Sequence, residues 1–190
     1  MADIYLDDKA YYNEVYRVSE LYNKPPQEVF YYPIWLKILH ITQNTDEIYE
    51  IGCGSGQLAN MLLSAGRNYV TGWDYAEEAI KLAHKLNPDH KDKFVCRDLY
   101  TFRGFKEGIT VISTEVLEHL DDDAFLIRLL PKGTRFIFSV PNYKAAMHKR
   151  IYPTLKSIRT RYRDLKILNH WRFDHVPNQK FIYLVDSIKK

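Results

Sequence analysis

The 190-residue chain is predicted to be a single α/β domain with a doubly wound, mostly parallel sheet. From residue 47 to residue 140, strand-like and helix-like patterns alternate along the chain. Strands that are joined by helical crossovers run parallel, with helices on both faces of the sheet. Near the end, two strand patterns are separated only by residues 174–179, which is too short for a crossover and suits an antiparallel hairpin. The fold class therefore combines a parallel core with a C-terminal hairpin.

The sequence contains seven strand patterns. Glycine or proline marks the end of several of the predicted strands and helices. The first strand, 47–51, runs into glycines, and the helix after it, 57–65, ends at Gly66. A second helix, 75–86, ends at Asn87-Pro88 because proline disfavours helical geometry in the residue before it, and a third, 122–130, ends at Pro131. The other predicted strands are 68–73, 93–96, 109–113, 134–140, 165–173 and 180–188.

The segment before the sheet has two helical patterns, 7–22 and 27–40, that are rich in tyrosine. We expect these helices to cap the open end of the sheet, where ligands of such folds bind. The single domain, 1–190, then divides into a helical cap (1–45), a cofactor-binding core (46–143), a basic helical segment (144–164) and the hairpin (165–190).

Composition limits the classes of protein that fit. The first residues lack the basic start and apolar run of a secretory signal, and no segment approaches the roughly 20 apolar residues that cross a bilayer. Two unpaired cysteines, Cys53 and Cys96, fit a reducing compartment, so a cytoplasmic protein without a membrane anchor is expected. Residues 144–172 carry nine Lys or Arg and one acid, although the whole chain has a net charge of only +3. This charge indicates a solvated helix face or, alternatively, an anionic partner such as RNA.

Three glycines at alternate positions, Gly52, Gly54 and Gly56, lie between the first predicted strand and its helix. A turn that is this tight needs residues without Cβ, which also let a ligand lie against the main chain. The spacing is not the G-x-G-x-x-G of dinucleotide sites, because the third glycine comes one residue early, and no Gly-Lys-Ser/Thr of a phosphate loop follows.

With Glu50 before it, this run resembles the first motif of the class I S-adenosylmethionine-dependent methyltransferases, an acidic residue followed by x-G-x-G-x-G. The resemblance extends from about residue 46 to 143 and implies a Rossmann-like, seven-stranded sheet with S-adenosyl-L-methionine as cofactor. It also implies that the glycine loop passes beneath the methionine part of the cofactor and that Glu50 helps to bind its amino group, for which a carboxylate is a charge-assisted acceptor.

The resemblance assigns further cofactor contacts at the ends of the next two strands. Asp74 would accept hydrogen bonds from both ribose hydroxyls, and Tyr75 would lie along the adenine. After the third strand, Asp98 would accept from the adenine amino group while the backbone amide of Leu99 meets the ring. An acid after a strand is also a common helix N-cap, so the order of all these elements, rather than any one of them, favours the assignment.

The segment Ser113–Leu120 resembles the Glu-x-Leu-Glu-His stretch of small-molecule branches such as the ubiquinone-pathway type. If it is helical, Glu115, Glu118 and His119 share one face, and three interpretations compete. In one, Glu115 lies beside the cofactor, Glu118 faces solvent and His119 packs at the end of the sheet. In another, His119 is a general base. The third is a divalent metal site like that of the small-RNA terminal 2′-O-methyltransferases, with His170 or His175 as an additional ligand. We assign His119 as catalytic and no metal ligand.

The fifth strand runs into Ser139-Val-Pro-Asn142, which resembles the same branches and not the amino-methylating enzymes that act on DNA bases. We therefore expect methyl transfer to an oxygen or nitrogen of a small-molecule acceptor. The alternatives are an RNA methyltransferase that uses the basic segment and a catalytically silent, cofactor-binding partner subunit. Five side chains are candidates for reaching the acceptor: Tyr11, Tyr12, His119, Tyr143 and His148.

Overall fold

The structure, a computed structural model, describes residues 8–177 and 179–190. Residues 1–7 and 178 lie outside this part. Three predictions from the sequence therefore fall partly outside the described residues. They concern the first residue of the helix predicted at 7–22, the residues that argue against a secretory signal, and one residue of the turn predicted at 174–179.

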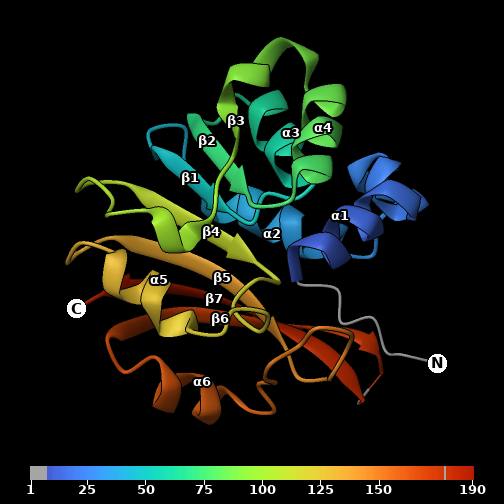
Figure 1. Ribbon diagram of the computed structural model, residues 1–190. Coiled ribbons are helices and arrows are strands. Elements are labelled where there is room, and N and C mark those ends of the chain that lie inside the picture. The colour runs from blue at the N-terminus through green and yellow to red at the C-terminus, as the bar shows by residue number, and fades with distance from the viewer. Residues whose placement is uncertain (1–7, 178) are drawn as a thin grey trace.

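A seven-stranded sheet in the order β3-β2-β1-β4-β5-β7-β6 forms the centre of the molecule (Figure 1). The strands are β1 (Ile48–Ile51), β2 (Tyr69–Asp74), β3 (Phe94–Cys96), β4 (Thr110–Thr114), β5 (Arg135–Pro141), β6 (Leu165–Val176) and β7 (Lys180–Lys189). The first five strands pair in parallel, while β7 runs antiparallel to both β5 and β6. The predicted fold class, with its C-terminal hairpin, is confirmed.

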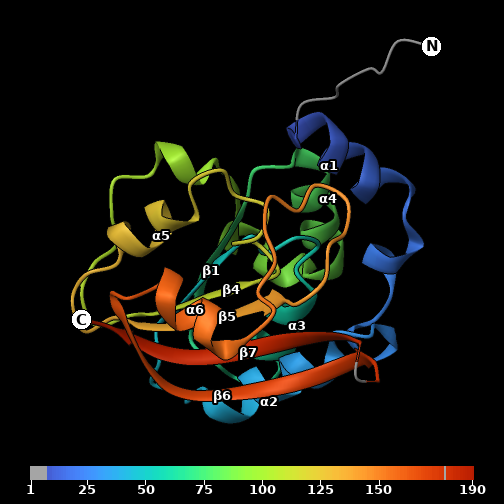
Figure 2. The same cartoon turned by 90° about the horizontal axis from the view of Figure 1, so that it is seen from below.

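Helices cover both faces of the sheet, as the central parallel strands require, because their side chains are buried on both sides. The α-helices are α1 (Asp8–Val18), α2 (Tyr32–Ile41), α3 (Gln57–Ser64), α4 (Glu77–Leu86), α5 (Asp123–Leu129) and α6 (Leu155–Arg161). Short 3₁₀ helices occur at Glu20–Asn23, Pro26–Glu28, Pro88–Lys93 and Leu99–Thr101. One buried apolar cluster joins α2, α3 and α4 to the sheet, and a second joins α5 and α6 to it. Figure 2 shows α2 on the opposite side of the strands from α5 and α6.

Three predicted helices are shorter than the sequence pattern suggested. The pattern over 7–22 becomes α1, which ends at Val18, and a 3₁₀ turn that begins at Glu20. The pattern over 27–40 becomes a 3₁₀ turn followed by α2, which begins at Tyr32 with Pro33 in its first turn. Proline is accepted there because the first N–H groups of a helix have no intrahelical partner, whereas inside a helix it would remove a hydrogen bond. In the basic segment 144–164, only α6 is helical and residues 144–154 form a loop.

The carboxyl ends of the parallel strands meet at one edge of the sheet, and α1 lies beyond this edge (Figure 1). The backbone joins the first two strands closely there, because the N–H groups of Gly52 and Cys53 both donate to the carbonyl of Trp73, at 2.7 and 2.9 Å. Of the two N-terminal helices that were expected to cap the open end, α1 lies there (Figure 1), whereas α2 packs against one face of the sheet (Figure 2). Among the described residues, no helix has both the length and the apolar character needed to cross a membrane.

Candidate active site

A cavity of about 640 Å³ lies at the carboxyl edge of the sheet. Its walls come from α1, the glycine turn, the end of β2, residues 97–100, the segment after β4 and the loop at 145–148. Nine of the ten residues that the sequence assigns to the site line it, namely Glu50, Gly52, Gly54, Asp74, Tyr75, Asp98, Leu99, Glu115 and His119. The topology therefore brings together residues that are up to 69 positions apart in the chain.

The glycine turn has the left-handed backbone that its composition predicts, with φ angles of +73°, +52° and +74° at Gly52, Gly54 and Gly56. A Cβ atom on Gly52 would lie 2.2 Å from Cγ2 of Val116, and one on Gly54 would lie 2.9 Å from the hydroxyl of Tyr16. Bare backbone at these two positions is what leaves room beside the cavity wall.

Gly56 is the one assigned residue that does not line the cavity. A Cβ atom there would approach Asn87 Nδ2 to 2.8 Å, and that same amide donates to the Gly56 carbonyl at 3.2 Å. The third glycine therefore permits close packing between the start of α3 and the end of α4, and no ligand contact is indicated for it.

Glu50 lies in the floor of the cavity and is almost fully buried, with 2% of its surface exposed. The hydroxyl of Tyr69 donates a hydrogen bond of 2.7 Å to its carboxylate. Burial raises the pKa of Glu50 to about 8, because desolvation of the charged form outweighs the stabilisation from this hydrogen bond. A cationic ligand in the cavity would meet a carboxyl group that has no described cationic partner.

Asp74 connects the end of β2 to the glycine turn. Its two carboxylate oxygens accept from the backbone N–H groups of Gly54 at 3.0 Å and Ala76 at 2.9 Å. Burial raises the pKa of Asp74 to about 6, against the opposing effect of these backbone hydrogen bonds. The carboxylate is thus fixed in orientation by the backbone while it faces the cavity.

The next wall follows β3. Asp98 accepts a hydrogen bond of 2.9 Å from the backbone N–H of Tyr100 and so caps the 3₁₀ turn that begins at Leu99. Leu99 is buried. The ring of Tyr75 lies 5.9 Å from that of Tyr12 on α1, centroid to centroid. These residues form a wall of flat and apolar groups with one carboxylate, and their contacts with adenine remain predictions.

The segment after β4 is not helical. Residues 115–120 form irregular turns, and Glu115 has a φ of +54°, which is strained for a residue with a side chain. Ser139 supports this turn, since its hydroxyl donates to the Glu115 carboxylate at 2.7 Å and accepts from the Glu115 N–H at 3.1 Å. Arg150 supports it further, because its guanidinium donates to the backbone carbonyls of Leu117, Leu120 and Asp121.

Glu118 does not face solvent, as one interpretation of the sequence had it. Its side chain is fully buried, and neither carboxylate oxygen has a hydrogen-bond partner in the described part of the chain. Burial, together with the nearby Glu115, raises the pKa of Glu118 well above its usual range.

His119 lies between the cavity and Glu118. The hydroxyl of Tyr12 is 2.6 Å from its Nδ1, and the ring of His148 lies 4.6 Å from its own, centroid to centroid. Burial, and then the neighbouring His148, lower the pKa of His119 to about 4, so the ring is neutral at neutral pH. A neutral imidazole beside a cavity is able to accept a proton.

The structure places some of the remaining candidate residues at the cavity and others away from it. Tyr11, Tyr12 and His148 line the cavity, whereas Tyr143 lies behind His148 with a ring separation of 6.3 Å. His170 is exposed on β6, and His175 packs on Phe30, so neither joins Glu118 and His119 in the cluster of possible metal ligands, where His148 is the third member.

Sequence reasoning missed Tyr16, which borders Gly54. Its position has a detectable signal, because it is four residues from Tyr12 and so shares a helix face with it. His148, which was expected near the acceptor together with His119, is brought beside His119 by the loop after β5. Part of the basic charge is also neutralised inside the protein, since Lys149 pairs with Asp8 and Asp121, and Arg161 with Asp123.

Comparison with known proteins agrees with this geometry. Residues 48–130 match the family model described as a methyltransferase domain. The ubiquinone biosynthesis O-methyltransferase of Hydrogenovibrio crunogenus is 33% identical over 92 residues, which are 46% of this chain and 38% of that enzyme. The match therefore spans well under two thirds of that relative's length.

Two solved structures share the whole fold. The magnesium protoporphyrin IX methyltransferase of Synechocystis PCC 6803, with bound S-adenosylmethionine, matches with a TM-score of 0.74 at 17% identity, covering 100% of both chains. The N-methyltransferase NodS of Bradyrhizobium japonicum, in complex with S-adenosyl-L-homocysteine, matches with a TM-score of 0.73 at 16% identity, covering 96% of this chain and 99% of that one. Residues 48–130 thus match a methyltransferase domain, and the strand order, with β7 between β5 and β6, is that of the α/β methyltransferase fold.

Proposed function

We propose that this chain binds S-adenosyl-L-methionine in the 640 Å³ cavity and transfers its methyl group to an oxygen or nitrogen of a small-molecule acceptor. The observation that carries the proposal is the position of Asp74. Its carboxylate is fixed by the N–H groups of Gly54 and Ala76 at the cavity wall, next to two glycines whose Cβ atoms would clash. This arrangement fits a ligand that offers hydroxyl donors and lies against bare backbone.

The other walls fit the remaining parts of the cofactor. Glu50 offers a buried carboxyl group to the ammonium of the methionine part, for which a carboxylate is a charge-assisted acceptor. Tyr75 and Leu99 offer a flat ring and an apolar side chain to adenine, and Asp98 offers an acceptor for its amino group. When bound, S-adenosylmethionine supplies a methyl group that is already activated on a sulfonium.

The acceptor would enter the part of the cavity between α1 and residues 145–148. The cavity volume falls within the roughly 300–1,000 Å³ that is usual for small ligands. The compared proteins, a ubiquinone biosynthesis O-methyltransferase and a magnesium protoporphyrin IX methyltransferase, also favour a small acceptor. Alignment of the acceptor atom with the methyl carbon supplies most of the catalysis in such a transfer, and His119, neutral and beside the cavity, would take the acceptor's proton.

The test is calorimetric titration with S-adenosylmethionine, its demethylated product and NAD, on the wild type and on Asp74→Ala. We expect both methionine-derived compounds to bind and NAD not to bind. Asp74→Ala should weaken cofactor binding by at least roughly 1.5 kcal/mol, about tenfold, because hydrogen bonds to a charged acceptor are lost. Unchanged affinity in this variant would remove Asp74 from the site.

Transfer of a labelled methyl group into a metabolite extract and into total RNA then identifies the acceptor class. Label in the metabolite fraction supports the proposal. Label in RNA would identify RNA as the substrate instead. RNA binding that weakens steeply as the salt concentration rises would then indicate contact through the basic segment. Cofactor binding without transfer to either pool, in a chain that co-purifies with another protein, would indicate a catalytically silent partner subunit.

A further inference from the structure

Glu118 presents a problem that the proposed function does not solve. Its carboxylate is fully buried, and neither oxygen has a hydrogen-bond partner among the residues that the structure describes. An ionised carboxylate inside a protein is costly unless a cation or a hydrogen-bond donor compensates it, and without one the group holds a proton, as the raised pKa of Glu118 indicates. The charge of the Arg150 guanidinium acts to lower the pKa of Glu118, but its hydrogen bonds go to the backbone carbonyls of residues 117, 120 and 121. Among the described residues, no side chain therefore donates a hydrogen bond to this carboxyl group.

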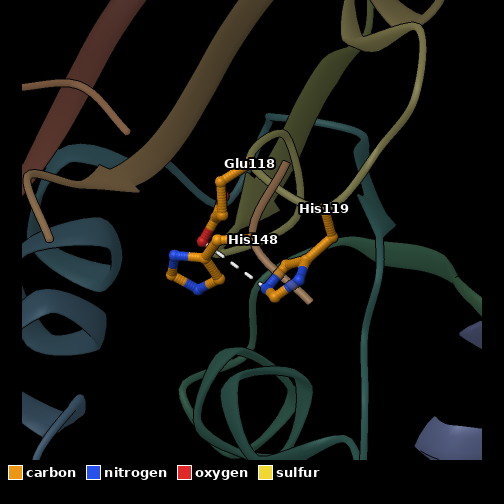
Figure 3. Close-up of side chains that lie close together, drawn as sticks. All are labelled: Glu118, His119 and His148. Atoms are coloured by element: carbon orange, nitrogen blue, oxygen red, sulfur yellow. Dashed lines mark ion pairs between the residues drawn. The ribbon is translucent and has the colours of Figure 1, made fainter. Parts of the chain in front are cut away.

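Two imidazoles converge on this carboxylate (Figure 3). His119 Nε2 is 3.8 Å from Glu118 Oε1, and one possible ligand atom from each of Glu118, His119 and His148 lies within 4.8 Å of the others. Metal–ligand bonds of about 2.1 Å hold two donor atoms on one ion roughly 3 to 4 Å apart. Ligand atoms 4.8 Å apart would therefore have to approach each other by about 1 Å when the ion binds. One carboxylate and two histidines are a donor set that suits divalent first-row transition metals better than Mg²⁺ or Ca²⁺.

In many metal sites, a hydrogen bond to the ring nitrogen that does not bind the metal fixes the orientation of each histidine, and both histidines here have such a neighbour. His148 Nδ1 lies 3.2 Å from the backbone carbonyl of Tyr143, and because a carbonyl can only accept, this nitrogen carries the proton and Nε2 keeps a lone pair. On His119, the Tyr12 hydroxyl lies 2.6 Å from Nδ1 and 3.5 Å from Nε2, and Nε2 is the nitrogen 3.8 Å from Glu118 Oε1. Coordination through Nε2 places the proton on Nδ1, so the Tyr12 hydroxyl would accept a hydrogen bond from it. The polar neighbours of both histidines are thus arranged as outer-shell partners.

The backbone around the cluster is also specialised. The N–H of Lys149 donates to the carbonyl of Glu118 at 2.8 Å and so fixes the loop that carries His148 against the turn that carries Glu118 and His119. In the described part of the chain, Glu115 and Met147 are the two non-glycine residues with positive φ, at +54° and +62°. Met147 directly precedes His148, Glu115 lies three residues before Glu118, and strain of this kind is concentrated at functional sites.

From these observations we propose that Glu118, His119 and His148 bind one divalent first-row transition metal ion. His119 and His148 also line the cavity, so an ion there would face the acceptor with coordination positions open. This inference rests on the proposed function for its role and points to an acceptor that bears a hydroxyl group. The ion would bind the hydroxyl oxygen and lower its pKa, replacing His119 as the group that promotes loss of the proton. That oxygen forms the bond to the methyl carbon, the carbon–sulfur bond breaks with its electron pair going to sulfur, and the hydroxyl proton leaves to solvent.

The experiment titrates CoCl₂ into the chelator-treated full chain, by visible absorption and by calorimetry. We expect one equivalent to bind with the absorption bands of Co²⁺ in a nitrogen and oxygen site. His148→Ala and Glu118→Gln should lose these bands, whereas His170→Ala, which changes an exposed histidine on β6, should keep them. Tyr12→Phe should weaken binding about tenfold, as loss of an outer-shell partner does.

Thermal unfolding adds a second readout. Co²⁺ should raise the Tm of the wild type and of His170→Ala but not of His148→Ala, and His148 is only half-buried, so that variant is expected to fold. Absence of Co²⁺ binding to the wild type, or equal binding by His148→Ala and His170→Ala, would overturn the metal site. Titration with S-adenosylmethionine tests the proposed function separately from the metal site. Metal binding without cofactor binding would contradict the proposed function and still support the metal site.

Discussion

Gly52 combines a left-handed backbone with a close neighbour, and this makes a simple substitution informative. A Cβ atom would lie 2.2 Å from Cγ2 of the Val116 side chain, and φ is +73°. The left-handed backbone alone costs a residue with Cβ roughly 1–2 kcal/mol, and the contact adds to that. Gly52→Ala should therefore lower the free energy of unfolding by more than about 2 kcal/mol and abolish cofactor binding, as measured by urea denaturation and calorimetry.

Gly66 is the matched control. Its φ is +68°, but a Cβ atom there would have no heavy atom within 4 Å. Gly66→Ala should show only the backbone cost and retain cofactor binding. If both variants lost the same stability and the same affinity, the contact with Val116 would not be the reason that position 52 requires glycine.

The raised pKa of Glu50 predicts that a proton is released when the cofactor binds. Burial raises its pKa to about 8, so at pH 7 the empty site holds mostly the neutral carboxyl. The ammonium of the cofactor favours the charged carboxylate and lowers that pKa, so binding at pH 7 should release a proton, while binding above about pH 9 should release none. Calorimetry in two buffers with different ionisation enthalpies measures the release. Glu50→Gln, which cannot ionise, should show no buffer dependence, and equal buffer dependence in both proteins would assign the proton to another group.

The segment after β4 shows that helical spacing does not by itself make a helix. Glu115, Glu118 and His119 are spaced so that they would share one face if the segment were helical. The backbone carbonyls that such a helix would use internally are instead hydrogen-bonded by Arg150, more than 25 residues later. A contact that distant leaves no trace in the local pattern, so the three residues were grouped correctly while their geometry was not.

Other elements were predictable because local signals mark them. The glycine turn before α3 and Asn87-Pro88 after α4 gave boundaries within a few residues. The start of α2 was predicted five residues early, although Pro33 carried the information, because a proline in the sixth or seventh position of a helix would break it.

The N-terminus of α4 depends on a side chain from another helix. Its own N-cap residue, Ala76, cannot accept a hydrogen bond through its side chain, and the N–H of Glu78 donates instead to Asn13 Oδ1 on α1 at 3.0 Å. Asn13→Ala should cost about 1 kcal/mol, as loss of a cap does, and should increase hydrogen exchange along α1, which has no buried residue. Asn13→Asp retains an acceptor with a charge that suits a helix N-terminus. Comparable losses in both variants would mean that the cap does not couple the two helices.

At the scale of the whole molecule, the sequence predicted a hairpin after the parallel core but not which of its strands lies inside the sheet. The structure places β7 between β5 and β6. The reason is visible in composition, because β7 is largely buried while β6 exposes most of its residues. An edge strand is protected from pairing with other chains by charged side chains, and Lys166 and Arg172 lie on β6. The pairing of β7 with β5 spans about 50 residues and has no local signature.

One arginine connects three distant parts of the molecule. Arg135 on β5 donates two hydrogen bonds of 2.9 Å to Asp186 on β7, a third to the carbonyl of Ile41 at the end of α2, and lies 3.5 Å from Asp46. Asp186 is only 3% exposed, so Arg135→Met leaves a buried carboxylate without its partner. Removal of one member of a buried pair typically costs about 3–5 kcal/mol, whereas replacement of both members by apolar residues is often neutral. Arg135→Met should thus lose most of that stability in urea denaturation, and adding Asp186→Leu should restore it. A double variant as unstable as the single one would show that the charges themselves, rather than compensation of a buried group, are what join the hairpin to the core.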